Sequence, residues 1–142
     1  MADNTKDLIT EYESARPKDP IAEYENATLK MALDERGSAI VVRLAGRITS
    51  GESARLFRER IRGLIGRQGL KKIVVDLSHV MYIDSTGLAE LVSAFTESRN
   101  AGIELVLAGL TRKVHDLMQI TKLYAIWNIF PTAEDALSAP EH

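Results

Sequence analysis

The 142-residue chain contains no cysteine and no apolar run approaching the roughly 20 residues that a membrane-spanning helix needs. Without cysteine, the chain cannot form disulfides, thiol nucleophiles or zinc–thiolate centres. The N-terminus lacks the basic and apolar regions of a signal peptide. We therefore expect a globular protein that does not span a membrane, with the cytoplasm as its default location.

Motifs for nucleotide and metal chemistry are also missing. The sequence has neither a Walker lysine motif nor a Gly-x-Gly-x-x-Gly turn, and it lacks the paired acids and late lysine of a receiver domain. Asp76 and Asp84 fall near the carboxyl end of one predicted strand, where open α/β sheets commonly place their sites. No third carboxylate lies nearby in the sequence, so we expect no metal and no cofactor. Asp76 is instead expected to cap or end its strand.

A serine hydrolase is one alternative that the sequence leaves open. Such an enzyme needs a nucleophile beside a base, usually on a Gly-x-Ser-x-Gly elbow. Residues 83–87 read Ile-Asp-Ser-Thr-Gly and lack the first glycine of that elbow. His79 and His115 are the two histidines that could pair with Ser85.

Aromatic residues make up only 6% of the chain, and charge is unevenly distributed along it. The formal net charge is −2, yet residues 1–28 hold seven acidic and three basic side chains. Residues 43–72 hold nine basic side chains against Glu52 and Glu59. Arg55, Arg58, Glu59 and Arg62 share the helix side opposite the apolar stripe, so we expect a solvated helix face. Aromatic residues do not alternate with the basic ones, so we expect no direct nucleic-acid partner. An acidic partner or a membrane surface is the alternative reading of this charge.

The chain divides into three predicted parts. Residues 1–26 are polar, acidic and interrupted by Pro17 and Pro20, which predicts a flexible N-terminal arm. Residues 27–138 are predicted to form one domain, because a chain of this size with 45% hydrophobic residues can bury one core. Residues 139–142 form a short tail.

Hydrophobic periodicity predicts an α/β fold with the order ββαβαβαβα, in which helices pack on a mixed β-sheet. A turn over 34–37 predicts an opening β-hairpin, and a loop over 46–51 follows it. The predicted strands are residues 28–33, 39–44, 72–77, 103–108 and 125–130. The predicted helices are one capped by Ser50 or Gly51 and ended by Gly66, one over 85–100, a short one opened by Thr111, and one over 131–137 capped by Thr132.

Ser85 and Thr86 place two hydroxyl groups where a buried strand ends and an amphipathic helix begins. Backbone N–H groups at a helix start accept an anion, and the helix dipole favours its negative charge. The hydroxyl pair therefore suits a phosphate. A sequence that only caps the helix is the alternative explanation.

Three segments resemble the STAS family, named for sulfate transporters and anti-sigma factor antagonists. They are the strand over 73–77, residues 81–88 with the sequence Met-Tyr-Ile-Asp-Ser-Thr-Gly-Leu, and residues 109–118 with the sequence Gly-Leu-Thr-Arg-Lys-Val-His-Asp-Leu-Met. The resemblance covers roughly residues 28–138, and within the family it looks like the bacterial anti-anti-sigma factors.

The resemblance implies regulation of transcription by partner switching. In such proteins the unphosphorylated antagonist binds an ATP-dependent serine/threonine kinase that doubles as the anti-sigma factor, and so frees the sigma factor. Phosphorylation at the position of Ser85, with Thr86 as the alternative acceptor, ends this binding, and a metal-dependent serine phosphatase restores it. The chain itself would be a substrate and ligand, not an enzyme. A STAS subunit of a transporter or larger signalling complex, never phosphorylated, is the second reading.

The predicted partner surface combines the strand–helix junction, the exposed side of the following helix and the loop after the second strand. Its residues are Thr49, Ser50, Gly51, Ile83, Asp84, Ser85, Thr86, Gly87, Leu88, Ala89, Glu90, Ser93 and Glu97. Many relatives carry a Gly-Glu-Leu-Asp-like sequence in that loop, whereas residues 46–49 here read Gly-Arg-Ile-Thr. This reversal of charge near the phosphorylation site points to a different partner or a changed kinase contact.

Overall fold

The computed structural model describes residues 12–13 and 22–140, and its centre is a sheet of six strands that lie in the same order as in the chain. The strands are β1 (Ala22–Glu25), β2 (Leu29–Arg36), β3 (Ala39–Ile48), β4 (Lys72–Ile83), β5 (Glu104–Ala108) and β6 (Ile129–Phe130). The first two pairings are antiparallel and the last three are parallel. The predicted α/β fold with a mixed sheet is confirmed.

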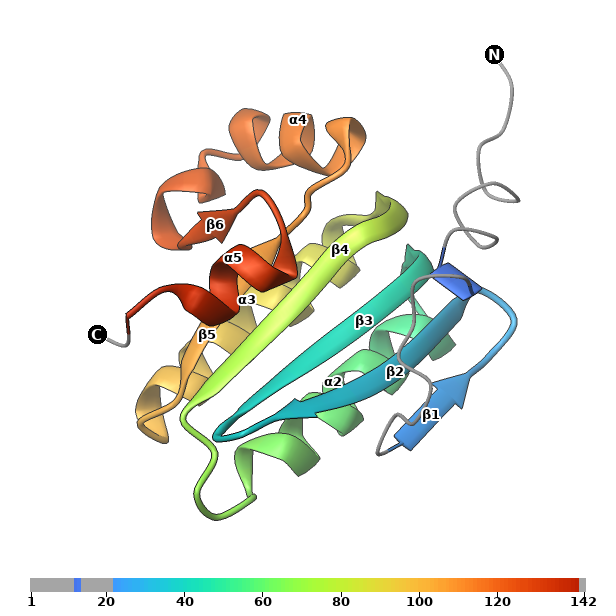
Figure 1. The fold of residues 1–142 in the computed structure, drawn as a ribbon. Helices are drawn as coiled ribbons and strands as arrows, with labels where there is room; N and C mark the ends of the chain where they lie inside the picture. Colours follow the sequence, from blue (N-terminus) through green and yellow to red (C-terminus); the bar gives the residue numbers. More distant parts are fainter. Residues whose placement is uncertain (1–11, 14–21, 141–142) are drawn as a thin grey trace.

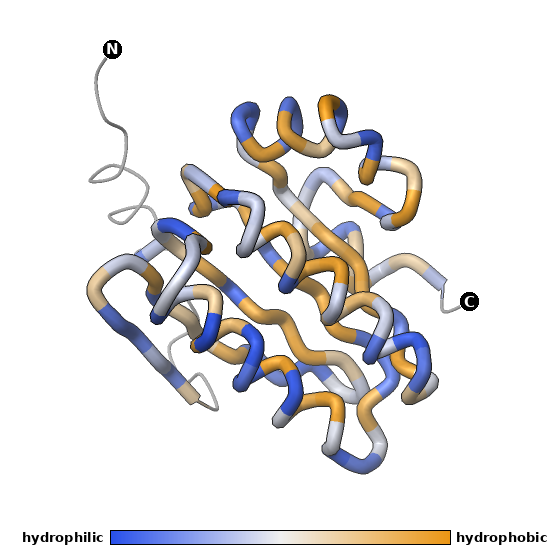
Figure 2. Tube along the Cα trace, turned by 180° about the vertical axis from the view of Figure 1, so that it is seen from behind, coloured by the Kyte–Doolittle hydropathy of each residue, from blue (hydrophilic) through white to orange (hydrophobic). Residues whose placement is uncertain are grey.

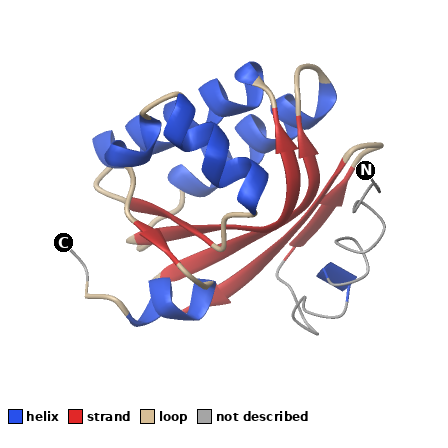
Figure 3. Ribbon diagram, turned by 90° about the horizontal axis from the view of Figure 1, so that it is seen from above, coloured by secondary structure: helices blue, strands red, loops and turns tan. Residues whose placement is uncertain are grey.

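Helices cover both faces of this sheet (Figures 1 and 3). They are α2 (Glu52–Ile65), α3 (Ser85–Asn100), α4 (Arg112–Ile120), α5 (Ala133–Ser138) and the 3₁₀ helix η1 (Leu123–Ile126). Figure 2 looks onto the face on which α2 and α3 lie side by side across the apolar strands. The short helix α5 packs on the opposite face.

Side chains along the central strands point alternately to the two faces of the sheet, and this explains why helices pack on both faces. On β3, Ile40 and Val42 belong to the core under α2 and α3, whereas Val41 packs with Ala133 and Ala136 of α5. Successive side chains of a strand point to opposite faces, so a strand buried on both sides is apolar at nearly every position. This is why the central strands show no polar alternation.

The opening hairpin is present and longer than predicted. β2 runs through Arg36, so the turn comprises Gly37 and Ser38, and not residues 34–37. Gly37 has φ 63°, which glycine adopts without strain in a two-residue hairpin turn. β3 and β4 also continue to Ile48 and Ile83, past the predicted ends at 44 and 77. Two register shifts in their parallel ladder interrupt the period-two pattern there, which is why the sequence predicted loops.

The predicted strand over 125–130 is wrong in most of its length. The chain forms η1 instead, and only Ile129 and Phe130 pair with β5. Trp127 is buried in the core and meets the ring of Phe95 edge-on. The apolar residues of this stretch therefore do not form a strand. The segment is held to the core by the indole ring of Trp127.

The predicted arm contains a strand. β1 pairs antiparallel with β2, and Tyr24 lies opposite Met31. Tyr12 is also buried, against Ala32 and Ala45. The rest of the predicted arm, residues 1–11 and 14–21, and residues 141–142 of the predicted tail lie outside the described residues.

Among the residues that the structure describes, no helix is both long enough and apolar enough to cross a bilayer.

Lys72 ties α5 to the sheet. Its side chain is only 4% exposed, and its Nζ donates to the carbonyl oxygens of Ala136 (2.9 Å) and Ala139 (3.1 Å) at the end of α5. Glu104 Oε1 lies 3.7 Å from the same ammonium. A cation at this place satisfies carbonyls that the helix itself leaves unpaired and complements the helix dipole.

We predict that Lys72→Ala lowers the free energy of unfolding by about 2 kcal/mol, because the buried carbonyl of Ala136 and the partly buried carbonyl of Ala139 lose a charged donor. Urea denaturation would measure the loss. Lys71→Ala, at the exposed neighbouring position, is the matched control and should stay within about 0.5 kcal/mol of the wild type. Equal urea midpoints for the two variants would contradict the role given to Lys72.

Candidate functional site at the start of helix α3

The two predicted hydroxyl residues lie at the first turn of α3. Asp84 is the N-cap, Ser85 is the first helical residue, and both Ser85 and Thr86 are exposed. Ile83, directly before the cap, is the last residue of β4 and is buried in the core. A single residue therefore separates a buried strand from an exposed pair of hydroxyls.

The carboxylate of Asp84 joins three segments. Its Oδ1 accepts the N–H of Gly87 at 2.8 Å, and its Oδ2 accepts the N–H of Ser50 at 2.8 Å. Its own N–H donates to the carbonyl of Ile48 at 3.2 Å. The hydrogen bond from Gly87, followed by that from Ser50, holds the pKa of the Asp84 carboxyl below its usual range.

This arrangement bears on the predicted phosphate site. The sequence suggested that backbone N–H groups at the start of the helix would accept a phosphate. The N–H of Gly87 is already bound by Asp84, so a phosphate on Ser85 would meet a carboxylate at the helix entrance. The phosphate and the carboxylate carry like charges and would repel each other. Burial of the phosphate or the carboxylate against a partner would strengthen the repulsion.

Gly87 allows the first turn of α3 to lie directly against the end of β3. A Cβ atom at Gly87 would overlap the carbonyl oxygen and carbon of Ile48, and it would come within 3.0 Å of that residue's Cγ2. Glycine is required here because two backbones approach closely, not because of an unusual φ angle. From the sequence, Gly87 was predicted only as a contact residue. Its role in the close approach of α3 to β3 was not predicted.

The loop after β3 lies against the α3 entrance, as predicted, and also caps α2. Thr49 N–H donates to Ser53 Oγ at 3.0 Å, and Ser53 Oγ donates back to the Thr49 carbonyl at 3.1 Å. Ser50 and Gly51 remain exposed, and Gly51 is the N-cap with φ 101°. The hydroxyl of Thr49 also lies 3.3 Å from Ser53 Oγ, so Thr49 is engaged within the chain, whereas the next two residues are exposed.

Three predicted contact residues are buried within the chain itself. Ile83 and Leu88 are 2% and 7% exposed, and Gly87 is covered by Ile48. They pack beneath the exposed hydroxyl pair, because the core-facing side of α3 begins at these residues. The predicted contact residues with exposed positions are Ser50, Gly51, Ser85, Thr86, Ala89 and Ser93.

The two predicted acidic contacts on α3 form ion pairs with α2. Glu90 accepts from Arg58 at 2.6 Å, and its side chain is 11% exposed. Glu97 pairs with Arg62 at 3.1 Å. These pairs explain the basic pattern of α2: part of its charge is matched by the neighbouring helix and does not face an external partner.

Other groups considered from the sequence lie in different surroundings. Asp76 lies inside β4, not at its end, and its Oδ2 accepts from Arg43 at 2.8 Å. His79 contacts the hydroxyl of Ser78 at 3.2 Å, and His115 meets the ring of Tyr124. Within residues 12–13 and 22–140, no group of three or more histidine, aspartate or glutamate side chains could hold a metal ion.

Tyr82 is an exposed residue beside the site that the sequence did not predict as a contact. It is 50% exposed, and it lies opposite Arg47 in the β3–β4 ladder. The predicted end of β4 at residue 77 concealed this pairing. A strand pattern of period two, counted again from residue 80, would have predicted that β4 continues to this pairing.

The profile of the STAS domain matches residues 30–136 of the chain. The chain belongs to the STAS domain family. This STAS chain is 24% identical over 113 residues to the anti-sigma F factor antagonist of Paenibacillus polymyxa. The alignment covers 80% of this chain and 96% of that protein. Over 55 residues it is 46% identical to an anti-sigma-B factor antagonist of Listeria monocytogenes, covering 39% of the chain and 48% of that protein.

Solved structures agree with the family. The anti-sigma factor antagonist SpoIIAA in its unphosphorylated form aligns with a TM-score of 0.65 at 19% identity, covering 75% of this STAS chain and 92% of SpoIIAA. The phosphorylated form of SpoIIAA from Bacillus aligns with a TM-score of 0.61 at 18% identity, covering 75% and 96%. At these identities the likeness establishes the STAS fold.

We predict that Gly87→Ala destabilises this STAS domain by about 2 kcal/mol, because the added methyl group forces α3 away from β3. Gly63→Ala is the matched control, since Gly63 also lies in a helix and has open space around its Cβ position. That control should gain about 0.5 to 1 kcal/mol. Thermal or urea unfolding would measure both, and equal gains in the two variants would contradict the close approach described here.

A second prediction concerns the charge on Asp84. Because the folded protein lowers the pKa of this carboxyl, its stabilising effect is fully present above the unfolded value of about 3.9 and is lost as the pH falls through the folded pKa. Asp84→Asn keeps a capping side chain but removes the charge. The stability difference between wild type and Asp84→Asn should be constant near neutral pH and shrink below about pH 4. A difference that stays constant through the acid range, measured by urea unfolding, would contradict it.

Proposed function

We propose that this STAS protein is an anti-sigma factor antagonist that acts by partner switching. The unphosphorylated chain binds a serine kinase that serves as the anti-sigma factor, and phosphorylation at Ser85 ends the binding. The observation that carries the proposal is the exposed hydroxyl of Ser85 at the first residue of α3, on a backbone fixed by Asp84 and Gly87. A kinase needs an acceptor that it can reach, and the exposed hydroxyl of Ser85 supports this role.

The chemistry assigns the chain the role of substrate. The kinase transfers the γ-phosphoryl group of ATP to Ser85 Oγ: a new O–P bond forms, the bond to the bridging oxygen breaks, and ADP leaves. The proton of the hydroxyl passes to a base of the kinase. A metal-dependent serine phosphatase reverses the step by adding water across the phosphoserine O–P bond. The chain contributes no catalytic group to either reaction.

Phosphorylation changes affinity through charge. The phosphate adds about −1.5 to −2 charge at neutral pH beside Asp84, and Glu52 lies in the first turn of the neighbouring helix α2. A partner that contacts this surface would have to desolvate these like charges together. A penalty of about 3 to 4 kcal/mol corresponds to several-hundredfold weaker binding. The core contacts of Ile83 and Leu88 lie on the other side of the backbone, so the fold should persist.

The relatives support this assignment. The proteins of similar sequence are named as antagonists of anti-sigma factors, and one protein of the same fold is known in both unphosphorylated and phosphorylated forms. Thr86 is also exposed and is the competing acceptor. We favour Ser85 because it matches the position of the acceptor serine in the family resemblance.

We expect the cognate serine kinase to transfer one phosphoryl group from ATP to the wild-type chain, and Ser85→Ala to abolish the transfer. Thr86→Ala and Ser93→Ala, at two further exposed hydroxyls of α3, are matched controls that should remain substrates. Mass spectrometry of the intact protein and of its peptides measures the modification. Phosphate found on Thr86 in the Ser85→Ala variant would overturn the choice of residue.

The same preparation tests the switch. Calorimetry should show that the phosphorylated chain binds the kinase at least about a hundredfold more weakly, while its melting temperature changes little. Equal affinities would contradict the charge mechanism. A chain that is never phosphorylated and co-purifies with a membrane transporter would instead support the structural STAS subunit.

A further inference from the structure

Arg47 and Tyr82 form an exposed pair on the sheet face opposite α2 and α3. They are register partners at the ends of β3 and β4, and their following neighbours Ile48 and Ile83 are both buried in the core under the helices. Side chains alternate along a strand, so Arg47 and Tyr82 project from the other face. Tyr82 lies three residues before Ser85, so this pair flanks the phosphorylation site across the edge of the sheet.

A cavity of about 320 Å³ adjoins Arg47 where β2 begins and β3 ends. Its polar lining includes Asn26, Thr28, Lys30 and Arg47. The N–H of Arg47 donates to the Thr28 carbonyl at 2.8 Å, which holds the two strands together below the cavity. The cavity is therefore framed by ordered backbone and carries two cationic side chains.

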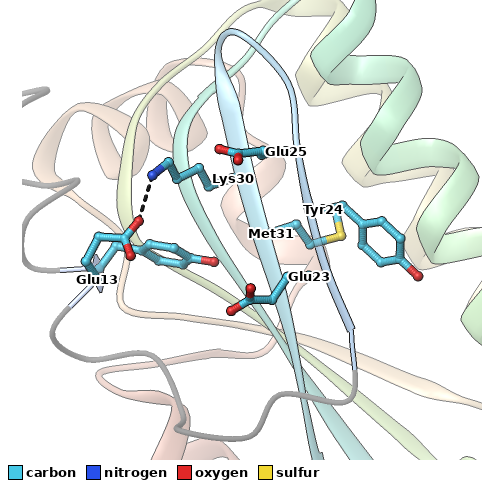
Figure 4. A pocket seen from close by; sticks show the side chains of 7 residues that line it. Glu13, Glu23, Tyr24, Glu25, Lys30 and Met31 are labelled. Carbon is cyan, nitrogen blue, oxygen red and sulfur yellow. Dashed lines mark hydrogen bonds and ion pairs between the residues drawn. The ribbon is translucent and has the colours of Figure 1, made fainter.

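The chain itself already docks a carboxylate on this face. Glu13 accepts from Lys30 Nζ at 2.6 Å, as Figure 4 shows, and the adjacent Tyr12 is buried against Ala32 and Ala45. Lys30 lines the cavity beside Arg47 and also the neighbouring cavity that Glu13 enters. An acidic segment lying on the open side of the sheet is thus an arrangement that this surface supports.

The guanidinium group of Arg47 has no ion pair with another described residue. The guanidinium groups with ion pairs are those of Arg36, Arg43, Arg58, Arg62 and Arg67. Within residues 12–13 and 22–140, the side chain of Arg47 makes neither an ion pair nor a hydrogen bond, and its backbone N–H donates to the Thr28 carbonyl. The exposed charge beside a half-exposed tyrosine ring is typical of a contact surface, because arginine and tyrosine are enriched at the centres of interfaces.

We infer that Arg47, Tyr82 and the adjoining cavity form a second contact surface that receives an acidic segment of the kinase partner. The inference rests on the proposed function and adds the charge of the partner. A guanidinium binds a carboxylate through two parallel hydrogen bonds, and the tyrosine ring supplies apolar contact beside it.

The test measures binding of the unphosphorylated chain to the kinase that modifies Ser85, by calorimetry at low, physiological and high NaCl concentrations. Arg47→Glu should weaken binding by about tenfold or more at physiological salt and flatten its dependence on salt. Lys71→Glu, the same change of charge at the opposite end of the sheet, should stay within about twofold of the wild type. Arg47→Gln, which keeps length and polarity, should fall between the wild type and Arg47→Glu. Melting temperatures near the wild-type value would show that each variant is folded.

The outcomes separate this inference from the proposed function. If the wild type binds the kinase and is phosphorylated but all Arg47 variants bind equally well, the second surface is overturned and partner switching stands. Tighter binding by Arg47→Glu would mean a basic partner segment and would also overturn the inference. A wild type that neither binds the kinase nor accepts phosphate would overturn the proposed function and this inference together. Restored binding of Arg47→Glu by an acidic-to-lysine change on the kinase would identify the facing carboxylate.

Discussion

The carboxylate of Asp84 is the contact on which the geometry of the site depends. One oxygen caps α3 through Gly87, and the other holds the loop of Ser50 that leads into α2. Two helix entrances and the ends of two parallel strands are thereby fixed relative to one another. A modification at the next residue can change the charge of the surface while the backbone beneath it stays in place. The same carboxylate would place a like charge beside a phosphate on Ser85, at a helix start where isolated helices attract anions.

The two faces of the sheet have different tasks. The face under α2 and α3 is apolar throughout and supplies most of the core. The opposite face combines a small apolar cluster under α5 with ionised groups, among them Lys72 at the end of α5 and the pair of Arg43 and Asp76. Buried charges are tolerated there because each finds partners. This polar face also leaves room for Tyr12 and for the cavity beside Arg47, neither of which fits on the helix-covered side.

The ion pairs decide which charges a partner meets. Arg58 and Arg62 are matched by Glu90 and Glu97 across the α2–α3 contact, so part of the charge of the basic stretch is paired within the chain. Arg47 is left facing outward beside the proposed phosphorylation site. The charge of a sequence segment therefore says little about the charge of a binding surface, because side chains of neighbouring helices form ion pairs within the folded chain.

The sequence by itself determined the order of the strands and α-helices from β2 onward, the limits of α3 and the position of its hydroxyl pair. These follow from periodicity and from capping residues that act over a few positions. It could not determine the extent of β4 or the strand at residues 22–25, since register shifts and edge pairing depend on neighbours distant in the chain. Only the tertiary structure decided that Gly87 and Leu88 support the site from below and that Glu90 is paired. It also decided that Arg47 stands beside Tyr82, because exposure and pairing arise only when separate segments meet.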